Sequence, residues 1–208
     1  MLFLHERLMA TASRQQEVVE RVGAIHSYMR KHPGFIGARV ARYMGNPNEY
    51  LVMRWWRRAE DLAEHQRNPE VPNWGANRPE GIYLEPPKTT RWESVTESGK
   101  ASDRFFVRTI YKPRQLDSSD LVDKLSQHIQ DGTKQGAMSW AQVFKSKEEG
   151  DLASAALLLA GFKDRDAFNL YLASSEGDDF AGQQNPFEVV LSGCFEVVEE
   201  ALPEAAAK

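Results

Sequence analysis

The chain has 208 residues, 41% of them apolar and 27% charged, an ordinary composition for a globular protein with room for two small domains. Its formal net charge of −4 argues against a broad nucleic-acid-binding surface. The single cysteine, Cys194, excludes an internal disulfide and any zinc site that needs several thiolates.

The charge is divided unevenly along the chain. Residues 1–98 carry 14 Lys and Arg against 12 Asp and Glu, whereas residues 99–208 carry 12 against 18. This asymmetry indicates two units that have diverged under different demands.

The N-terminal segment lacks the pattern of a targeting signal. Its apolar stretch is interrupted by His5, Glu6 and Arg7. No apolar run in the chain approaches the roughly 18–20 residues that a membrane-spanning helix needs. We therefore expect a cytoplasmic protein with no membrane partner.

Six elements are predicted in the first half, in the order strand, helix, strand, strand, helix, strand. Alternating polarity predicts the strands, and apolar residues at helical spacing predict the helices. The first helix is expected to have Ser13 as its N-cap and Gln16 as the capping-box partner. The expected elements are a strand at 2–10, a helix between Ser13 and His32, strands at 35–44 and 50–56, a helix at 59–67 and a strand near 89–95.

The second half repeats this pattern. Phe106-Val107 lies 103 residues after Phe3-Leu4, and the offset changes to 106 where residues 155–162 correspond to residues 49–56. The offset changes only in loops, as expected after a duplication. We therefore expect domains at 1–97 and 104–200, with a linker at 97–103 and a frayed tail at 201–208.

The order β-α-β-β-α-β is typical of a ferredoxin-like α+β sandwich, in which two helices cover one face of an antiparallel sheet. The strand at 50–56 is apolar on both faces, so the second face needs another sheet, which the duplicated half supplies. The predicted fold class is α+β, with two tandem ferredoxin-like domains whose antiparallel sheets form an intrachain dimeric α+β barrel. Any further homodimer would be built outside that barrel.

Three segments of the first half carry a family resemblance: a Pro-Gly-Phe entry to a strand, a strand that ends in Trp, and a short helix that ends in a polar aromatic residue. The segments are His32-Pro33-Gly34-Phe35-Ile36-Gly37, Tyr50-Leu51-Val52-Met53-Arg54-Trp55-Trp56 and Ala59-Glu60-Asp61-Leu62-Ala63-Glu64-His65. They resemble the antibiotic-biosynthesis-monooxygenase-like family of the dimeric α+β barrel superfamily. The resemblance covers residues 1–97 well and 104–200 weakly. It implies relatives that include cofactor-free oxygenases of polycyclic phenols, haem-degrading enzymes and members with no assigned activity.

Haem degradation is not expected. The haem-degrading branch uses an Asn on the first strand, a Trp on the second helix and a His about ten residues further on. Here the first strand offers Glu6 and Arg7, the helix position is His65, and Gly75 lies ten residues beyond it. In the second half Tyr171 replaces His65, and no histidine follows.

The candidate catalytic residues are His65 and Arg54. A histidine near its neutral pKa can act as a base, although His65 could equally interact with the carbonyls at the end of its helix. Arg54, if it points inward, would stabilise an anion formed from the substrate.

The candidate ligand-binding residues are Trp56, Asn73, Trp74 and Asn77. Trp56 could wall a pocket for a flat ligand, although core packing is the simpler explanation for a tryptophan on a strand. Trp74 lies with Asn73 and Asn77 in the long loop 68–90, whose length is typical of a lid or binding loop. Its alternative role is to anchor that loop.

No metal site, cofactor or nucleic-acid partner is expected. No histidine pair has zinc or iron spacing, and no Gly-rich phosphate loop follows a strand. The run Arg54–Arg58 mixes Arg and Trp at a strand end, where snorkelling side chains explain it better than nucleic acid. The histidines expected at edges, surfaces or helix ends are His5, His26, His32 and His128.

The leading hypothesis, which comes from the resemblance, is a cofactor-independent monooxygenase of a phenolic or quinol-like small molecule. The alternatives are a non-catalytic small-molecule-binding module and a structural barrel protein. The aromatic ligand is expected in the first half, because its loop holds Trp74 and amides whereas residues 173–186 are small and acidic. The excess of arginine in the first half also suits an anionic phenolate.

Overall fold

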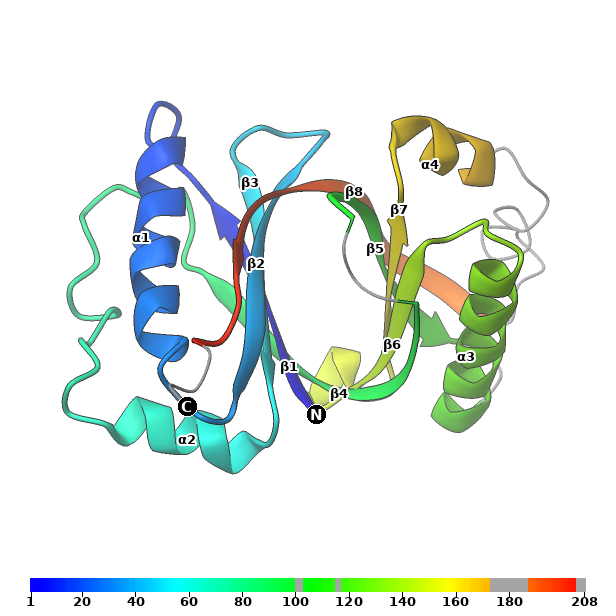
Figure 1. The fold of residues 1–208 in the computed structure, drawn as a ribbon, viewed down its shortest axis with the longest axis horizontal. Coiled ribbons are helices and arrows are strands. Elements are labelled where there is room, and N and C mark those ends of the chain that lie inside the picture. Colours follow the sequence, from blue (N-terminus) through cyan, green and yellow to red (C-terminus); the bar gives the residue numbers. More distant parts are fainter. Residues whose placement is uncertain (100–102, 115–116, 173–186, 205–208) are drawn as a thin grey trace. The chain divides into compact units, whose positions relative to one another are not determined.

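The computed structural model in Figure 1 describes residues 1–99, 103–114, 117–172 and 187–204. It contains eight strands, four α-helices and one short 3-10 helix within those residues. In chain order they are β1 (Leu2–Met9), α1 (Gln15–Met29), β2 (Phe35–Tyr43), β3 (Glu49–Trp56), α2 (Ala59–Arg67), β4 (Lys88–Gly99), β5 (Phe105–Pro113), α3 (Ser118–Lys134), β6 (Trp140–Ser146), η1 (Gly150–Leu152), β7 (Ala156–Phe162), α4 (Arg165–Leu172) and β8 (Phe187–Ala201).

The strands form an antiparallel barrel. Their hydrogen-bonded order is β1-β3-β2-β8-β5-β7-β6-β4, and the barrel is closed. The predicted fold class, two ferredoxin-like halves that build an intrachain α+β barrel, is thereby confirmed.

Two compact units make up the chain, and each contains a strand end from the other half of the sequence. The first unit is Met1–Arg91 with Val197–Lys208, and the second is Trp92–Glu196. As a result, β4 begins in the first unit and continues in the second, whereas β8 begins in the second and ends in the first. The predicted linker starts within β4, and its residues 100–102 lie outside the described part of the chain.

The first unit packs α1 and α2 against one face of its sheet (Figure 1). The buried stripe of α1 is Val18, Val22, His26 and Met29, at the spacing of one helical face. Strand β3 is buried along almost its whole length on both faces, as its apolar pattern predicted. The helix α2 ends at Arg67, because the next residue, Asn68, is extended and precedes a proline.

The start of α1 differs from the prediction. Ser13 does not cap the helix but adopts a left-handed conformation with φ 70°, and Arg14 occupies the N-cap position without a side-chain cap. The Arg14 guanidinium instead bonds Glu17 and the Glu80 carbonyl, so the helix end is held from the 68–87 loop.

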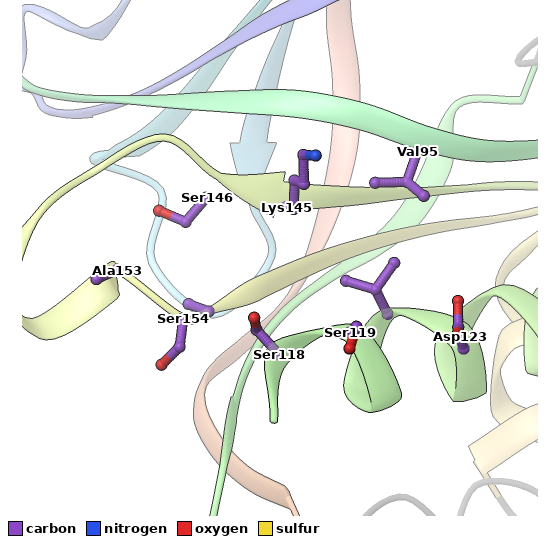
Figure 2. A pocket seen from close by; sticks show the side chains of 10 residues that line it. Val95, Ser118, Ser119, Asp123, Lys145, Ser146, Ala153 and Ser154 are labelled. Carbon is purple, nitrogen blue, oxygen red and sulfur yellow. The ribbon is translucent and has the colours of Figure 1, made fainter. Parts of the chain in front are cut away.

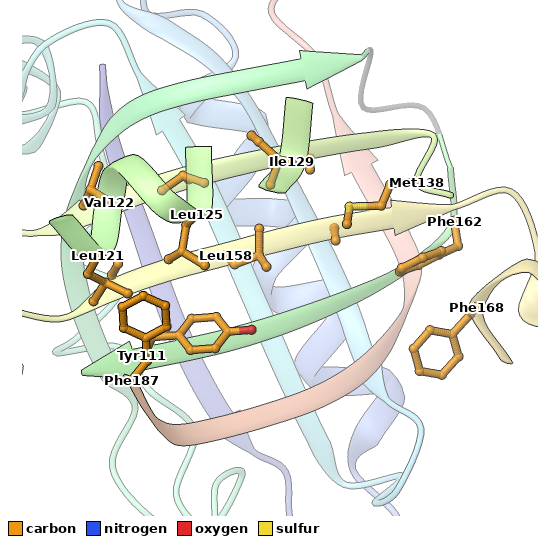
Figure 3. Packing of buried hydrophobic residues seen from close by; sticks show 14 residues of the cluster. Tyr111, Leu121, Val122, Leu125, Ile129, Met138, Leu158, Phe162, Phe168 and Phe187 are labelled. Atoms are coloured by element: carbon orange, nitrogen blue, oxygen red, sulfur yellow. The ribbon is translucent and has the colours of Figure 1, made fainter. Parts of the chain in front are cut away.

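The second unit buries an apolar cluster between α3, α4 and its strands (Figure 3). Leu121, Leu125 and Ile129 form the buried stripe of α3 and belong to this cluster with Leu158 and Phe162. The helix begins at Asp117, whose side chain accepts from the backbone N–H of Ser119 and Asp120.

The pairing registers of the two units repeat with the offsets read from the sequence. Leu4 lies opposite Arg54 between β1 and β3, and Val107 lies opposite Ala160 between β5 and β7. These positions differ by 103 and 106 residues respectively. Structurally equivalent positions can therefore be compared residue by residue.

Gly161→Ala should expose how tightly β7 is packed. A Cβ at Gly161 would lie 1.8 Å from Trp140 Nε1, and Trp140 is fully buried. We expect the substitution to lower the free energy of unfolding by about 3 kcal/mol through overpacking. Gly37→Ala is the matched strand control, because its Cβ would make only an ordinary contact of 3.5 Å. Equal urea midpoints for the two variants would contradict this packing.

Candidate functional site

The candidate site is a cavity of about 490 Å³ in the first unit. Its size falls within the range of about 300–1,000 Å³ that is typical of small-molecule sites. Four of the six predicted site residues line it: Arg54, His65, Asn73 and Trp74. The other lining residues are Leu4, Glu6, Met29, Leu62, Gln66, Val71, Pro72 and Thr89.

A buried ion pair forms one wall of the cavity. Arg54, on β3, is 6% exposed and donates from Nη1 to Glu6 Oε2 on β1 at 2.7 Å. The two residues are diagonal neighbours on one face, because Glu6 lies opposite Val52 in the strand register. The site thus presents a positive and a negative group next to each other.

A second contact holds the same guanidinium from the helix side. Arg54 Nε donates to His26 Nε2 at 3.3 Å, and His26 Nδ1 lies 3.5 Å from Glu199 Oε1 at the end of β8. His26 is 1% exposed, so its predicted surface position is wrong. It lies four residues after Val22 on the buried stripe of α1, a spacing that the sequence already contained.

His65 lies buried on the α2 side of the cavity. It is 4% exposed, and its ring packs on Trp56 at 5.3 Å and on His32 at 5.8 Å between centroids. Burial, with a smaller contribution from His32, lowers the pKa of His65. A neutral imidazole has one nitrogen free of a proton, so it can accept one.

Trp74 is anchored to α1 and also lines the cavity. Arg21 donates to its carbonyl oxygen and lies over its ring at 5.5 Å, and Tyr28 meets the ring edge-on at 5.9 Å. Its buried Nε1 has no acceptor among the described residues. The two roles considered for Trp74, loop anchor and cavity wall, therefore coexist.

Trp56 and Asn77 do not line the cavity. Trp56 is fully buried behind His65, where it packs against His32 and Phe35, so its role is core packing and support of the imidazole. Asn77 is exposed, and its backbone N–H donates to the Asn73 carbonyl within the loop.

Sequence reasoning missed Glu6 as a lining residue and His26 as its neighbour. The available signal for Glu6 was its alternation with Leu4 and Leu8, which places a carboxylate on the helix-covered face of β1. A charge on an apolar face needs a partner, and Arg54 is the guanidinium on the same face of the adjacent strand.

A family match covers this part of the chain. Residues 1–76 match the family model described as antibiotic biosynthesis monooxygenase. These residues of the first unit are therefore similar to that family. The match includes Glu6, Arg54, His65 and Trp74, and it ends before the last cavity residue, Thr89.

Solved structures show the fold of the whole tandem. A candidate monooxygenase from Fusobacterium nucleatum subsp. nucleatum is 9% identical, with a TM-score of 0.76 over 97% of this chain and 94% of its own. An anthrone oxidase-like protein is 14% identical, with a TM-score of 0.70 over 100% and 96%. A candidate monooxygenase from Lactobacillus acidophilus is 12% identical, with a TM-score of 0.67 over 98% and 97%. No curated protein matches the chain.

The second unit has no charged group and no imidazole at the positions equivalent to Glu6, His26, Arg54 and His65. The residues equivalent to Glu6, His26 and Arg54 are Thr109, Ile129 and Ala160. Ile129 and Ala160 belong to the apolar cluster of Figure 3, which occupies this region. Tyr171 stands where His65 does, and its hydroxyl lies 2.9 Å from His128 Nε2.

The second unit has a different cavity of about 320 Å³ at the start of α3 (Figure 2). Serine hydroxyls and one cation, Lys145, line it, but Lys145 is paired with Glu93 at 3.1 Å. It holds neither an aromatic ring nor a histidine. The loop 173–186, which the sequence comparison used, lies outside the described residues.

The part of the chain that the structure describes has neither a cluster of metal-ligating side chains nor a membrane-crossing helix. No cluster of three or more His, Cys, Asp or Glu side chains in that part of the chain is arranged to hold a metal ion. No helix there combines the length and apolarity that crossing a membrane requires.

The buried histidines His26 and His65 of the first unit should make stability depend on pH. Burial lowers the pKa of His26 and of His65 below the value of about 6.5 that they have when unfolded. Below that pH the unfolded state binds more protons, so stability is complete above about pH 6.5 and falls as the pH decreases. Urea denaturation at pH 7.5 and 5.0 tests this, and His26→Ile should reduce the difference. Equal stability at both pH values would contradict it.

Proposed function

We propose that the chain is a cofactor-independent monooxygenase that oxidises a phenolic or anthrone-like aromatic compound in the cavity of its first unit. The observation that carries this proposal is a buried imidazole and a buried guanidinium that line one cavity together with apolar side chains. The match of residues 1–76 to the monooxygenase family and the fold shared with an anthrone oxidase-like protein support the reaction class.

His65 acts as the general base. The substrate of such a reaction must first lose a proton from an acidic C–H or O–H, because its anion gives an electron to O₂ far more readily than the neutral molecule. Burial lowers the pKa of His65 and thereby favours the unprotonated imidazole that a base requires. Its packing against Trp56 fixes the ring at the cavity wall.

Arg54 receives the negative charge that this step creates. Its Nη1 donates one N–H to Glu6 and its Nε donates to His26, which leaves the Nη2 N–H groups and the second Nη1 N–H for a substrate oxygen. The apolar side chains of Leu4, Met29 and Leu62 lower the polarity around the guanidinium and strengthen this charge interaction.

The oxidation itself needs no group beyond O₂ and the substrate. With an anthrone, the carbanion at the methylene carbon passes an electron to O₂, and the two radicals combine to a peroxide at that carbon. The peroxide loses water, one oxygen atom stays as the new carbonyl, and the product is an anthraquinone. One O₂ is consumed, and one quinone and one water form.

The test uses anthrone and ¹⁸O₂ with protein that has been treated with a chelator and is free of flavin. We expect O₂ uptake above the buffer rate and an anthraquinone that contains one ¹⁸O atom. Anthrone binding without added O₂ uptake would instead support the non-catalytic binding module. Neither binding nor uptake, with anthrone or with a panel of naphthols, would contradict the proposal and leave the structural alternative.

A further inference from the structure

The Arg54 guanidinium contacts a buried histidine, His26, at a position that an apolar side chain could fill. His26 accepts a hydrogen bond from Arg54 Nε at 3.3 Å and is 1% exposed. Burial of a polar ring among apolar side chains is costly unless its hydrogen bonds are used. The second unit shows that an apolar residue serves the same place in the helix.

That comparison extends to the stripe residues that precede His26. The equivalents of Val18, Val22 and His26 are apolar without exception. They are Leu121, Leu125 and Ile129. The unit that has Ala160 in place of Arg54 also has no histidine on its helix stripe, so His26 and Arg54 occur together and are absent together.

The orientation of His26 follows from its two contacts. Its Nε2 accepts from Arg54, so in the neutral ring the proton is on Nδ1. Nδ1 lies 3.5 Å from a Glu199 carboxylate oxygen. The carboxylate therefore favours the tautomer that can accept from Arg54.

Space for Glu199 is provided by a glycine within α1. A Cβ at Gly23 would lie 3.1 Å from both Glu199 carboxylate oxygens. Glycine is a poor helix former, so its presence in the middle of α1 is explained by this close approach.

We propose that His26 and Glu199 are positioning residues that fix the Arg54 guanidinium, so that the cavity prefers an anionic aromatic ligand to its neutral form. This inference rests on the proposed function, because it concerns the ligand of the same site. It makes the last segment of β8 part of a site whose other residues lie within the first 90 of the chain.

Four variants separate positioning from packing. His26→Ile removes the acceptor and installs the residue of the second unit, so the variant should fold. His26→Gln restores an acceptor for Arg54 and a donor for Glu199. Glu199→Gln removes the carboxylate charge and so weakens the preference of His26 for the tautomer that carries its proton on Nδ1. Glu200→Gln is the matched control, because Glu200 is the next residue of β8 and pairs with Arg39 at 2.8 Å.

The probe is 4-nitro-1-naphthol, whose phenolate absorbs visible light whereas its phenol does not. In the wild-type protein we expect the bound probe to ionise about one pH unit lower than the free probe, a tenfold preference for the anion. His26→Ile should remove this shift, His26→Gln should restore most of it, and Glu199→Gln should reduce it. Glu200→Gln should leave it unchanged.

A shift retained in His26→Ile would overturn the inference. A shift lost in both His26 variants would do the same, since packing rather than hydrogen bonding would then be responsible.

If the wild-type protein binds no naphthol or anthrone at all, the proposed function fails, and ¹⁵N NMR of the free protein decides the inference separately. An unprotonated His26 Nε2, with Arg54 Nε–H protected from exchange only while His26 is present, would support positioning. A protonated Nε2 would overturn it.

Discussion

Arg54→Ala is expected to lower the free energy of unfolding by about 3 kcal/mol, because it leaves the Glu6 carboxylate without its partner in a mostly buried position. The side chains of Arg54 and Glu6 are only 8% and 16% exposed, so water cannot replace the lost ion pair fully. Arg104→Ala is the surface control. Its pair with Glu196 is long, at 3.6 Å, and the Arg104 side chain is 68% exposed, so its loss should cost less than about 1 kcal/mol.

Replacement of the whole polar group should recover most of that stability. The triple variant Glu6→Thr, His26→Ile and Arg54→Ala carries the residues that the second unit has at these positions. It leaves no buried charge at these three positions, so its free energy of unfolding should exceed that of Arg54→Ala, while it gains no affinity for an anion. Urea denaturation of the wild-type protein, Arg54→Ala and the triple variant measures their free energies of unfolding. A triple variant less stable than Arg54→Ala would show that the ion pair is not the source of the loss.

His65→Phe is expected to reduce kcat for anthrone oxidation by a factor of about 10²–10⁴, the usual contribution of a general base. Phenylalanine keeps a flat ring against Trp56 and His32, so KM should change much less than kcat. Tyr171→Phe is the matched change in the second unit and should leave both constants unaltered. Unchanged turnover in His65→Phe, with turnover lost in Tyr171→Phe, would place the reaction in the other unit.

The fold could be predicted because its determinants are periodic. The apolar run of β3 and the helical spacing in α1 survive in both halves, and the offsets of 103 and 106 reproduce the observed strand registers. The exchange of the ends of β4 and β8 between the units could not be seen, since strand pairing partners are not encoded in local pattern. The prediction that Ser13 is the N-cap was wrong, because the backbone of Ser13 is in the left-handed region just before the helix.

The site could be predicted only in part. His65 and Trp74 stand out because a histidine ends a short helix and a tryptophan lies in a long loop. The role of Trp56 cannot be read from the sequence, since whether a strand tryptophan faces a cavity or the core depends on the helix above it. The roles of Glu6 and His26 could not be predicted without the tertiary structure. Each role depends on a contact with Arg54, which lies far from both residues in the sequence.

The measurement that tests the account most directly is a crystal structure of the protein with 4-nitro-1-naphthol bound. We expect the ring system in the cavity of the first unit, with its oxygen within hydrogen-bond distance of Arg54 Nη2 and its edge towards His65. Density for the ligand in the cavity beside Ser118 and Lys145, with the first cavity empty, would contradict the account.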